Sequence, residues 1–140
     1  MNSLPEDCVE LIYRFNPVTY NKLTFGFREL KVKYDDDLTT EILLTFKSKI
    51  ISIECNYNIT NEGIKHLTQL RSLNLSSNKT ITDEGIKPLT QLKNLNLFNN
   101  NTITDEGIKH LTQLRNLNLA GNRTITKKGI KHLKICKIIR

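Results

Sequence analysis

Residues 70–91 read LRSLNLSSNKTITDEGIKPLTQ, and residues 92–113 read LKNLNLFNNNTITDEGIKHLTQ. The two stretches agree at most positions without a gap, so the sequence repeats with a period of 22 residues. A third copy at 114–135 and a weaker copy at 48–69 extend the repeat in both directions. Each copy has a glycine at the same place, namely Gly63, Gly85, Gly107 and Gly129. A fixed period of this size indicates a fold built by stacking one small unit.

The spacing of apolar residues changes within each copy. Leu73 and Leu75 are separated by one asparagine, which is the period-two pattern of a short strand. Ile86 and Leu89 are three residues apart, as on one side of a helical turn. Between these two patterns, Thr82 is followed by two acidic residues, and both residue types favour the start of a helix. Each unit is therefore predicted to form a strand, a loop and a short helix.

The recurring pattern L-x-x-L-x-L-x-x-N resembles the leucine-rich repeat signature. The resemblance implies an α/β solenoid, a short right-handed horseshoe arc with a parallel β-sheet on its concave face and helices on its convex face. A unit of 22 residues cannot bury its own apolar side, so its leucines must pack against their counterparts in the adjacent repeats.

An asparagine ends the strand pattern in every copy. The four residues of this column are Asn56, Asn78, Asn100 and Asn122. Because an amide both donates and accepts hydrogen bonds, we expect a structural ladder that pairs backbone groups of neighbouring repeats. Contact of these asparagines with a ligand is the alternative that we disfavour, since buried polar groups must first satisfy the backbone.

The C-terminal end of the array departs from the pattern. The copy at 114–135 has Lys127 and Lys128 in place of the acidic pair, as expected of an atypical terminal repeat. A stub follows it, in which the repeat period places Cys136 and Ile139 in the columns of Leu92 and Leu95. We expect the stub to cap this end of the solenoid, because terminal leucines must be covered.

Residues 1–47 do not follow the period, so we expect a separate small helical cap before repeats that occupy 48–140. Ser3 and Glu6 suit a capping box, Val9 and Ile12 continue an apolar stripe, and a proline ends the predicted helix.

The order Leu4-Pro5-Glu6-Asp7, then a helix, then a proline before a second apolar cluster, resembles an F-box. Short proteins that combine an F-box with leucine-rich repeats occur in eukaryotes and in giant DNA viruses. The resemblance implies binding to a Skp1-type adaptor of a cullin-type ubiquitin ligase. The residues implied are Leu4, Pro5, Ile12, Phe15, Pro17 and Leu23. The other interpretation is that this segment only covers the N-terminal end of the solenoid, and both interpretations stay open here.

The side chains that alternate with the leucines are expected to line the concave face. In the first copy these are Ile50, Ser52 and Glu54. The predicted partner-binding residues of the later copies are Ser72, Asn74, Asn94, Asn96, Phe98, Asn116 and Asn118. Amides on a rigid sheet suit a protein partner, and Phe98 is a candidate hot spot. The alternative is a plain scaffold with a solvated sheet face.

The charge of the chain is uneven. Residues 1–47 hold 6 basic and 8 acidic side chains, whereas residues 48–140 hold 15 basic and 6 acidic ones. A basic solenoid could bind nucleic acid, which is our third hypothesis. We disfavour it because the basic region has few aromatic residues for stacking on bases.

Other functional classes lack support in the sequence. No motif of an activated nucleophile, a phosphate-binding loop or a zinc protease is present, so we predict a protein that is not an enzyme and needs no cofactor or metal. The three cysteines, Cys8, Cys55 and Cys136, suit reduced thiols of an intracellular protein. We expect a cytoplasmic monomer that does not enter a membrane, in the host cytoplasm if the source is viral.

Overall fold

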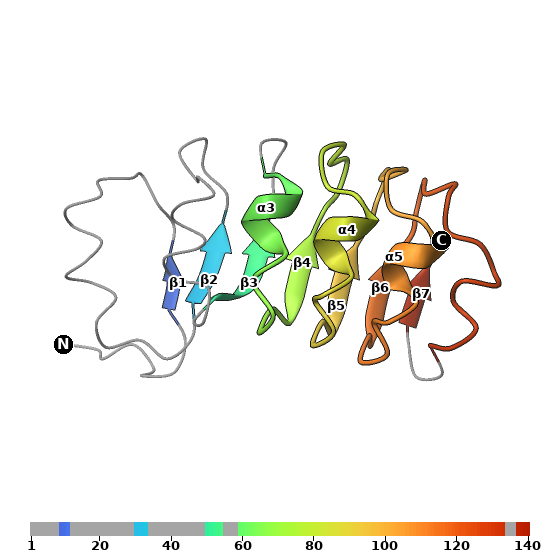
Figure 1. The fold of residues 1–140 in the computed structure, drawn as a ribbon. Coiled ribbons are helices and arrows are strands. Elements are labelled where there is room, and N and C mark those ends of the chain that lie inside the picture. The colour runs from blue at the N-terminus through green and yellow to red at the C-terminus, as the bar shows by residue number, and fades with distance from the viewer. Residues whose placement is uncertain (1–8, 12–29, 34–49, 55–58, 134–136) are drawn as a thin grey trace.

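A computed structural model of the chain describes residues 9–11, 30–33, 50–54, 59–133 and 137–140. Within this part, seven strands form one parallel sheet in the order of the sequence (Figure 1). The strands are β1 (Val9–Leu11), β2 (Leu30–Lys33), β3 (Ile50–Glu54), β4 (Ser72–Asn74), β5 (Asn94–Asn96), β6 (Asn116–Asn118) and β7 (Lys137–Ile139). Three short helices alternate with them, namely α3 (Asn61–Ile64), α4 (Asp83–Ile86) and α5 (Asp105–Ile108).

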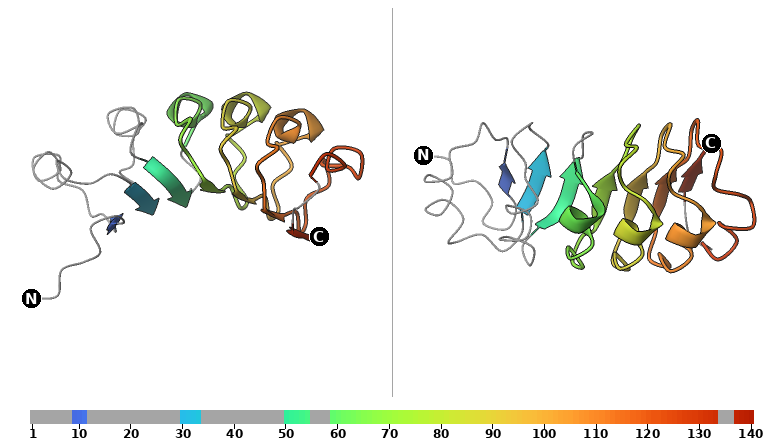
Figure 2. Two further views of the ribbon diagram at one scale, coloured as in Figure 1. Left: turned by 90° about the horizontal axis from the view of Figure 1, so that it is seen from below. Right: turned by 45° about the horizontal axis from the view of Figure 1, so that its top comes forward.

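The strands and the helices form two layers of a curved row. Seen along the strands, the helices lie on the outer side of the curve and the strands on its inner side (Figure 2). The predicted solenoid, with a parallel sheet on the concave face and helices on the convex face, is therefore confirmed. Each unit contributes one strand and one helical turn, because the apolar spacing changes from two to three residues within it.

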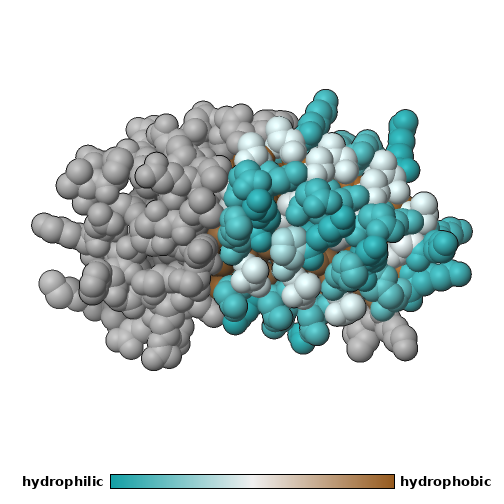
Figure 3. Space-filling view, in the orientation of Figure 1, coloured by the Kyte–Doolittle hydropathy of each residue, from teal (hydrophilic) through white to brown (hydrophobic). Residues whose placement is uncertain are grey.

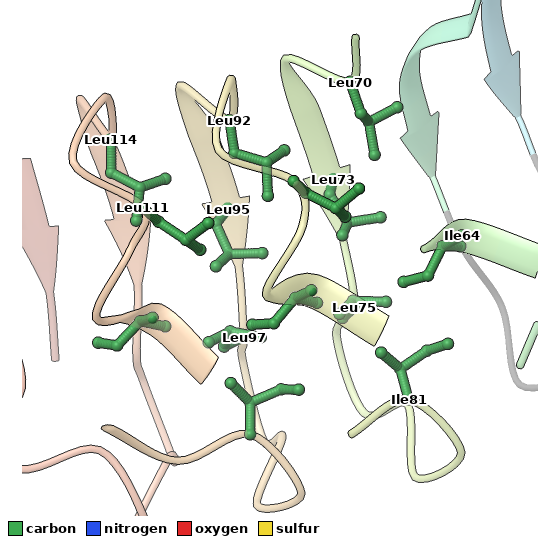
Figure 4. Close-up of a cluster of buried hydrophobic side chains, with 14 of the residues drawn as sticks. Ile64, Leu70, Leu73, Leu75, Ile81, Leu92, Leu95, Leu97, Leu111 and Leu114 are labelled. Atoms are coloured by element: carbon green, nitrogen blue, oxygen red, sulfur yellow. The ribbon is translucent and has the colours of Figure 1, made fainter. Parts of the chain in front are cut away.

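The core lies between the two layers. Leu73 pairs in register with Leu95, and Leu95 pairs with Leu117, so each leucine stacks on its counterpart in the next repeat. All three side chains are almost fully buried. Figure 4 shows that leucines and isoleucines from successive repeats form continuous columns between strand and helix. Stability therefore comes from contacts between neighbouring repeats, as expected of a solenoid.

The first acidic residue of α4 connects two repeats. Asp83 Oδ1 accepts a hydrogen bond from the backbone N–H of Thr104 at 2.8 Å, and its Oδ2 accepts one from Thr104 Oγ1 at 2.6 Å. Asp105 makes the same two bonds with Thr126 in the next repeat. We call this contact the Asp–Thr bridge. Asp83 and Asp105 thus hold the following repeat, a role beyond the predicted dipole effect.

The repeated glycines leave room for this bridge. An added Cβ on Gly107 would collide with Asp83 Oδ1 and would lie 3.0 Å from Asp83 Cγ. At Gly85 the corresponding Cβ would lie 2.5 Å from Asn61 Oδ1. The glycine column therefore receives the side chain that reaches across from the preceding repeat.

Gly107→Ala is expected to lower the free energy of unfolding by about 1 to 3 kcal/mol, because the methyl group displaces the carboxylate that holds Thr104. The expected sign is opposite to that of an ordinary helical site, where alanine is favoured over glycine by about 1 kcal/mol. Urea denaturation followed by circular dichroism measures the change. Glu106→Ala, at an exposed neighbouring position, should change stability by about 0.5 kcal/mol or less. A neutral or stabilising Gly107→Ala would contradict the proposed role of the glycine.

The N-terminal segment differs from the helical prediction where the structure describes it. Val9–Leu11 forms strand β1, which pairs in parallel with β2. The predicted helix is therefore wrong at these three residues. Val9 and Leu11 flank a single glutamate, so they have the same alternation as Leu73 and Leu75, and sheet pairing decides between the two readings. The sheet thus continues across the boundary predicted at residue 47.

The register of the first repeat also differs from the prediction. The repeat period aligns Ile51 with Leu73, but the structure pairs Ile53 with Leu73, so β3 is displaced by two positions. Ile50 was expected on the concave face and is instead 1% exposed in the core. A strand can shift in this way because the connection to the next strand absorbs the difference in length.

A shift by one position changes the C-terminal stub. Ile138 pairs with Leu117, so Ile138 rather than Ile139 occupies the leucine column. Ile139 is 49% exposed, since a slip by a single position moves a side chain to the other face of the sheet. Strand β7 still covers the edge of β6, in agreement with the predicted cap. Residues 127–132 form turns rather than a helix, as the loss of the acidic pair would favour.

Candidate functional site

The inner face of the sheet carries a shallow groove that crosses strands β3 to β7. Its volume is about 280 Å³. We call it the concave groove, and its lining consists of Glu54, Ser72, Leu73, Asn74, Asn94, Leu95, Asn96, Asn116, Leu117, Asn118, Lys137 and Ile139. Six of the seven predicted partner-binding residues line this groove together, with Phe98 as the exception.

One column of the groove consists of Asn74, Asn96 and Asn118. In each residue, Oδ1 accepts a hydrogen bond at 3.0 Å from the backbone N–H two positions later. A backbone N–H can only donate, so this bond fixes which amide atom faces the backbone. Within the described residues, Nδ2 of the three side chains has no protein acceptor, so the column presents donors to the groove.

A second column consists of Ser72, Asn94 and Asn116. Asn116 Nδ2 donates to Asn94 Oδ1 at 2.7 Å, and both asparagines are exposed. This bond uses the acceptor of Asn94 and a donor of Asn116. Asn94 Nδ2 and Asn116 Oδ1 are thus the groups of this pair that a ligand could reach.

Phe98 lies in the loop after β5 and its side chain is 41% exposed. Its backbone N–H donates to Asn96 Oδ1, and its carbonyl oxygen accepts from Ser77 N–H at 2.8 Å. Its side chain is not part of the groove lining. Phe98 is therefore an exposed aromatic residue outside the groove lining, and its role as a hot spot stays a prediction.

The two ends of the groove carry opposite formal charges. Glu54 ends β3 on one side, and Lys137 begins β7 on the other. Sequence reasoning placed Glu54 on this face but missed Lys137 and Ile139, because it set the stub out of register by one position. Residues 137–139 read Lys-Ile-Ile, so either isoleucine fits the leucine column and the sequence alone does not fix this register.

The ladder asparagines lie behind the sheet face and do not contact the groove. Asn78 and Asn100 are buried, and Asn100 Nδ2 donates to the carbonyl oxygens of Asn78 at 3.0 Å and Leu75 at 3.2 Å. Asn100 Oδ1 accepts from the backbone N–H groups of Thr102 and Ile103. Asn122 Nδ2 donates in the same way to the carbonyl oxygen of Asn100, whereas Asn56 lies outside the described residues.

Threonine hydroxyls form a second column of bonds between repeats that the sequence analysis missed. Thr80 Oγ1 donates to the carbonyl oxygen of Ile59, and Thr102 Oγ1 donates to that of Ile81 at 2.6 Å. Thr124 repeats the contact with Ile103. The recurrence of threonine two positions after the ladder asparagine was the available signal.

The convex face is hydrophilic in the described repeats (Figure 3). Each helix carries an ion pair with the partners three positions apart, and the pairs are Glu62 with Lys65, Glu84 with Lys87 and Glu106 with Lys109. The hydrogen bond from the lysine lowers the pKa of each glutamate below its usual value. These lysines are neutralised locally, so they do not form a continuous basic surface.

Excess basic charge is concentrated toward the C-terminal end. Residues 110–140, which follow the Glu106–Lys109 pair, contain eight basic side chains and no acidic ones. Lys127 and Lys128 replace the acidic pair of the earlier helices, so the ion pair of the convex face is not repeated there.

The described residues offer no metal centre, because no group of three His, Cys, Asp or Glu side chains among them could hold an ion. His66 and His110 are exposed, and His132 Nε2 lies 3.2 Å from the carbonyl oxygen of Ile108. The predicted adaptor-binding residues Leu4, Pro5, Ile12, Phe15, Pro17 and Leu23 lie outside the described residues. In the part of the chain that the structure describes, no helix is long and apolar enough to cross a membrane.

Comparisons with known proteins agree with this geometry. The family model of the Leucine Rich repeat matches residues 66–89, 90–111 and 110–134. No curated protein matches the chain in sequence.

Solved structures supply further similarities. A chain in the crystal structure of the Rad7 and Elc1 complex in yeast is 25% identical, with a TM-score of 0.60 over 81% of this chain and 32% of that chain. A chain in the crystal structure of the TLR13-ssRNA13 complex is 20% identical, with a TM-score of 0.59 over 81% of this chain and 19% of that chain. The present chain thus spans a third or less of these proteins.

Proposed function

Residues 66–134 are leucine-rich repeats, and from this premise we propose that the chain binds a protein partner in the concave groove. The solenoid is an interaction module, because its repeated residues build a rigid scaffold with an extended concave face. The observation that carries the proposal is the row of aligned amides on β4, β5 and β6, which no other described element covers.

The groove suits recognition because its polar groups are fixed before a ligand arrives. The strands hold Asn74, Asn96 and Asn118 in register, and a backbone bond orients each amide. Little side-chain freedom is then lost on binding, which favours affinity. The 25% identical structural relative comes from a complex of two proteins, Rad7 and Elc1, which is consistent with a protein partner.

The test is whether capture of a partner depends on this face. Asn94→Trp combined with Asn116→Trp fills the groove with neutral bulk and should reduce capture from extract of the source cells at least tenfold. Thr90→Trp with Thr112→Trp is the matched control, since both threonines are exposed outside the groove and also occupy equivalent positions of adjacent repeats. Far-ultraviolet circular dichroism of both variants checks that they remain folded. Equal capture by both pairs would contradict the proposal.

A second hypothesis concerns the N-terminal segment, whose likeness to an F-box implies a Skp1-type adaptor and a role in recruiting substrates to a cullin-type ubiquitin ligase. The relative from the Rad7 and Elc1 complex supports a complex with a second protein. Strand β1 instead favours the interpretation that this segment extends and covers the sheet.

Pull-down with purified Skp1-type adaptor separates the two interpretations. Adaptor binding that is lost on Leu4→Ala with Pro5→Ala supports the F-box interpretation. If the intact chain does not bind the adaptor, or if Leu4→Ala with Pro5→Ala does not change the binding, the segment only covers the N-terminal end of the solenoid.

A further inference from the structure

We propose that the concave groove selects an extended, acidic segment of its protein partner. This inference rests on the proposed function and adds the chemistry of the partner. It starts from the orientation of Asn74, Asn96 and Asn118, whose Oδ1 atoms are all held by backbone N–H groups at 3.0 Å. Each Oδ1 thus already accepts one hydrogen bond, whereas the Nδ2 groups have no protein acceptor among the described residues, so the column offers mainly donors to a ligand. A ligand along this column must therefore offer acceptors in three successive repeats.

The geometry of the sheet sets the length of the ligand. Neighbouring strands lie about 4.8 Å apart, so donors of adjacent repeats recur at about this interval. The groove crosses five strands, from β3 to β7, which corresponds to about 19 Å between the outer two. An extended polypeptide advances about 3.3 to 3.6 Å per residue, so a segment of about six residues spans the groove.

The charge around the groove selects the sign of the ligand. Lys137 is the basic side chain of the groove lining and lies at its β7 end, opposite Glu54. It belongs to a segment, residues 110–140, that carries eight basic and no acidic side chains. Carboxylates accept hydrogen bonds from amides and are attracted to this end of the solenoid. Acidic side chains of the ligand are therefore expected over β5, β6 and β7.

The opposite end of the groove favours a polypeptide over a nucleic acid. Glu54 lines the β3 end, and Asn116 Oδ1 is a further acceptor on the surface. Backbone N–H groups of a polypeptide can donate to both, whereas the phosphates of a nucleic acid would be repelled by Glu54. The groove lining also contains no aromatic side chain on which bases could stack.

Substitution of a groove asparagine by aspartate tests the contribution of its outward Nδ2 donor. Asn96→Asp keeps an oxygen that accepts from Phe98 N–H, so the loop after β5 should be preserved, while the outward donor becomes an anionic acceptor. Asn101→Asp is the matched control. Asn101 Oδ1 accepts from the backbone N–H of Arg123 at 2.7 Å, and the residue is exposed outside the groove. The two variants have the same net charge and keep the same kind of backbone bond.

Fluorescence anisotropy of the full-length chain tests the proposal. The probes are a fluorescein-labelled hexapeptide of alternating Glu and Val, the same peptide with Gln in place of Glu, and a single-stranded thymidine oligonucleotide. We expect the chain to bind the acidic peptide at least tenfold more tightly than the Gln peptide. We expect Asn96→Asp to weaken that binding at least tenfold and Asn101→Asp to change it less than twofold.

Three outcomes would overturn the inference: no preference for the acidic peptide, equal weakening by the two aspartate variants, or tighter binding of the oligonucleotide than of the acidic peptide. If the inference fails while the paired groove tryptophans still abolish partner capture, the groove remains the binding site and only the acidic chemistry is wrong. If the tryptophan pair has no effect either, the proposed function fails with it.

Discussion

Asn100→Ala is expected to lower the free energy of unfolding by about 3 to 5 kcal/mol, because several buried backbone groups lose their partners at once. The carbonyl oxygens of Leu75 and Asn78 lose a donor, and the N–H groups of Thr102 and Ile103 lose an acceptor. Asn100 is fully buried, so water cannot replace these bonds without entering the core. Urea denaturation followed by far-ultraviolet circular dichroism measures the loss.

The neighbouring residue provides the control for this prediction. Asn101→Ala removes a hydrogen bond to Arg123 N–H at an exposed site, where water can take over, so a cost of about 0.5 to 1 kcal/mol is expected. Asn100→Asp keeps the acceptor but turns a carboxylate toward two carbonyl oxygens, and it should also be strongly destabilising above the pKa of that carboxyl group. Similar costs for Asn100→Ala and Asn101→Ala would show that the ladder contributes little.

Leu95→Ala is expected to cost about 3 to 4 kcal/mol of unfolding free energy. Leu95 is 2% exposed and lies in register between Leu73 and Leu117, with repeats on both sides. Removal of its side chain leaves a cavity that these neighbours cannot fill, which adds to the lost apolar transfer. Chemical denaturation of the purified variant measures the cost.

Two residues nearer the C-terminal end of the array serve as controls for Leu95→Ala. Leu133→Ala, in the last described turn before β7, should cost about 1 to 2 kcal/mol, because Leu133 is 7% exposed and its surroundings can relax. Ile139→Ala should be close to neutral, since that side chain is 49% exposed. If Leu95→Ala and Leu133→Ala lower the free energy of unfolding equally, the stability of a repeat does not depend on having a packed repeat on both sides.

Much of the fold could be predicted because the repeat period carries three kinds of information together. Leucines in alternate positions indicate the strands, the change to every third position indicates the helical turns, and the recurring asparagine marks the exit from each strand. Local pattern and stacking agree in residues 70–122, so the interpretation needed no knowledge of distant contacts. The same alternation predicts that six of the groove residues share one face of the sheet.

The errors occurred where strand pairing departs from the repeat period. β3 meets β4 through Ile53 and Leu73, and β7 meets β6 through Ile138 and Leu117, so β3 and β7 are both closer in sequence to these neighbours than the period of 22 residues requires. Strand pairing decides such registers, and pairing is a contact between segments that a repeat count cannot supply. The helix predicted at Val9 was wrong for a related reason, since so short an apolar pattern fits a helix or a strand until a neighbouring strand is present.

The orientation of the groove amides could not be predicted from the sequence. Asparagine in alternate positions indicates a polar sheet face but not which atom points outward. That choice depends on the backbone N–H of Ser76, Phe98 and Ala120, which come within reach only when the chain bends after each strand. The chemistry of the groove is thus set by loop geometry, whereas its location is set by the repeat.

The Asp–Thr bridge determines where a further repeat could be added to the array. Asp105 holds Thr126 of the unit that follows it, but the equivalent position in that unit is Lys127, whose side chain cannot accept the same two bonds. An extra copy of residues 92–113 inserted after residue 113 would therefore find every such contact intact and would lengthen the groove by one strand. The same copy added after residue 135 would meet lysine instead. Duplication of a repeat within the array thus preserves all Asp–Thr bridges. Addition of a repeat after the last unit would first require an acidic residue at position 127.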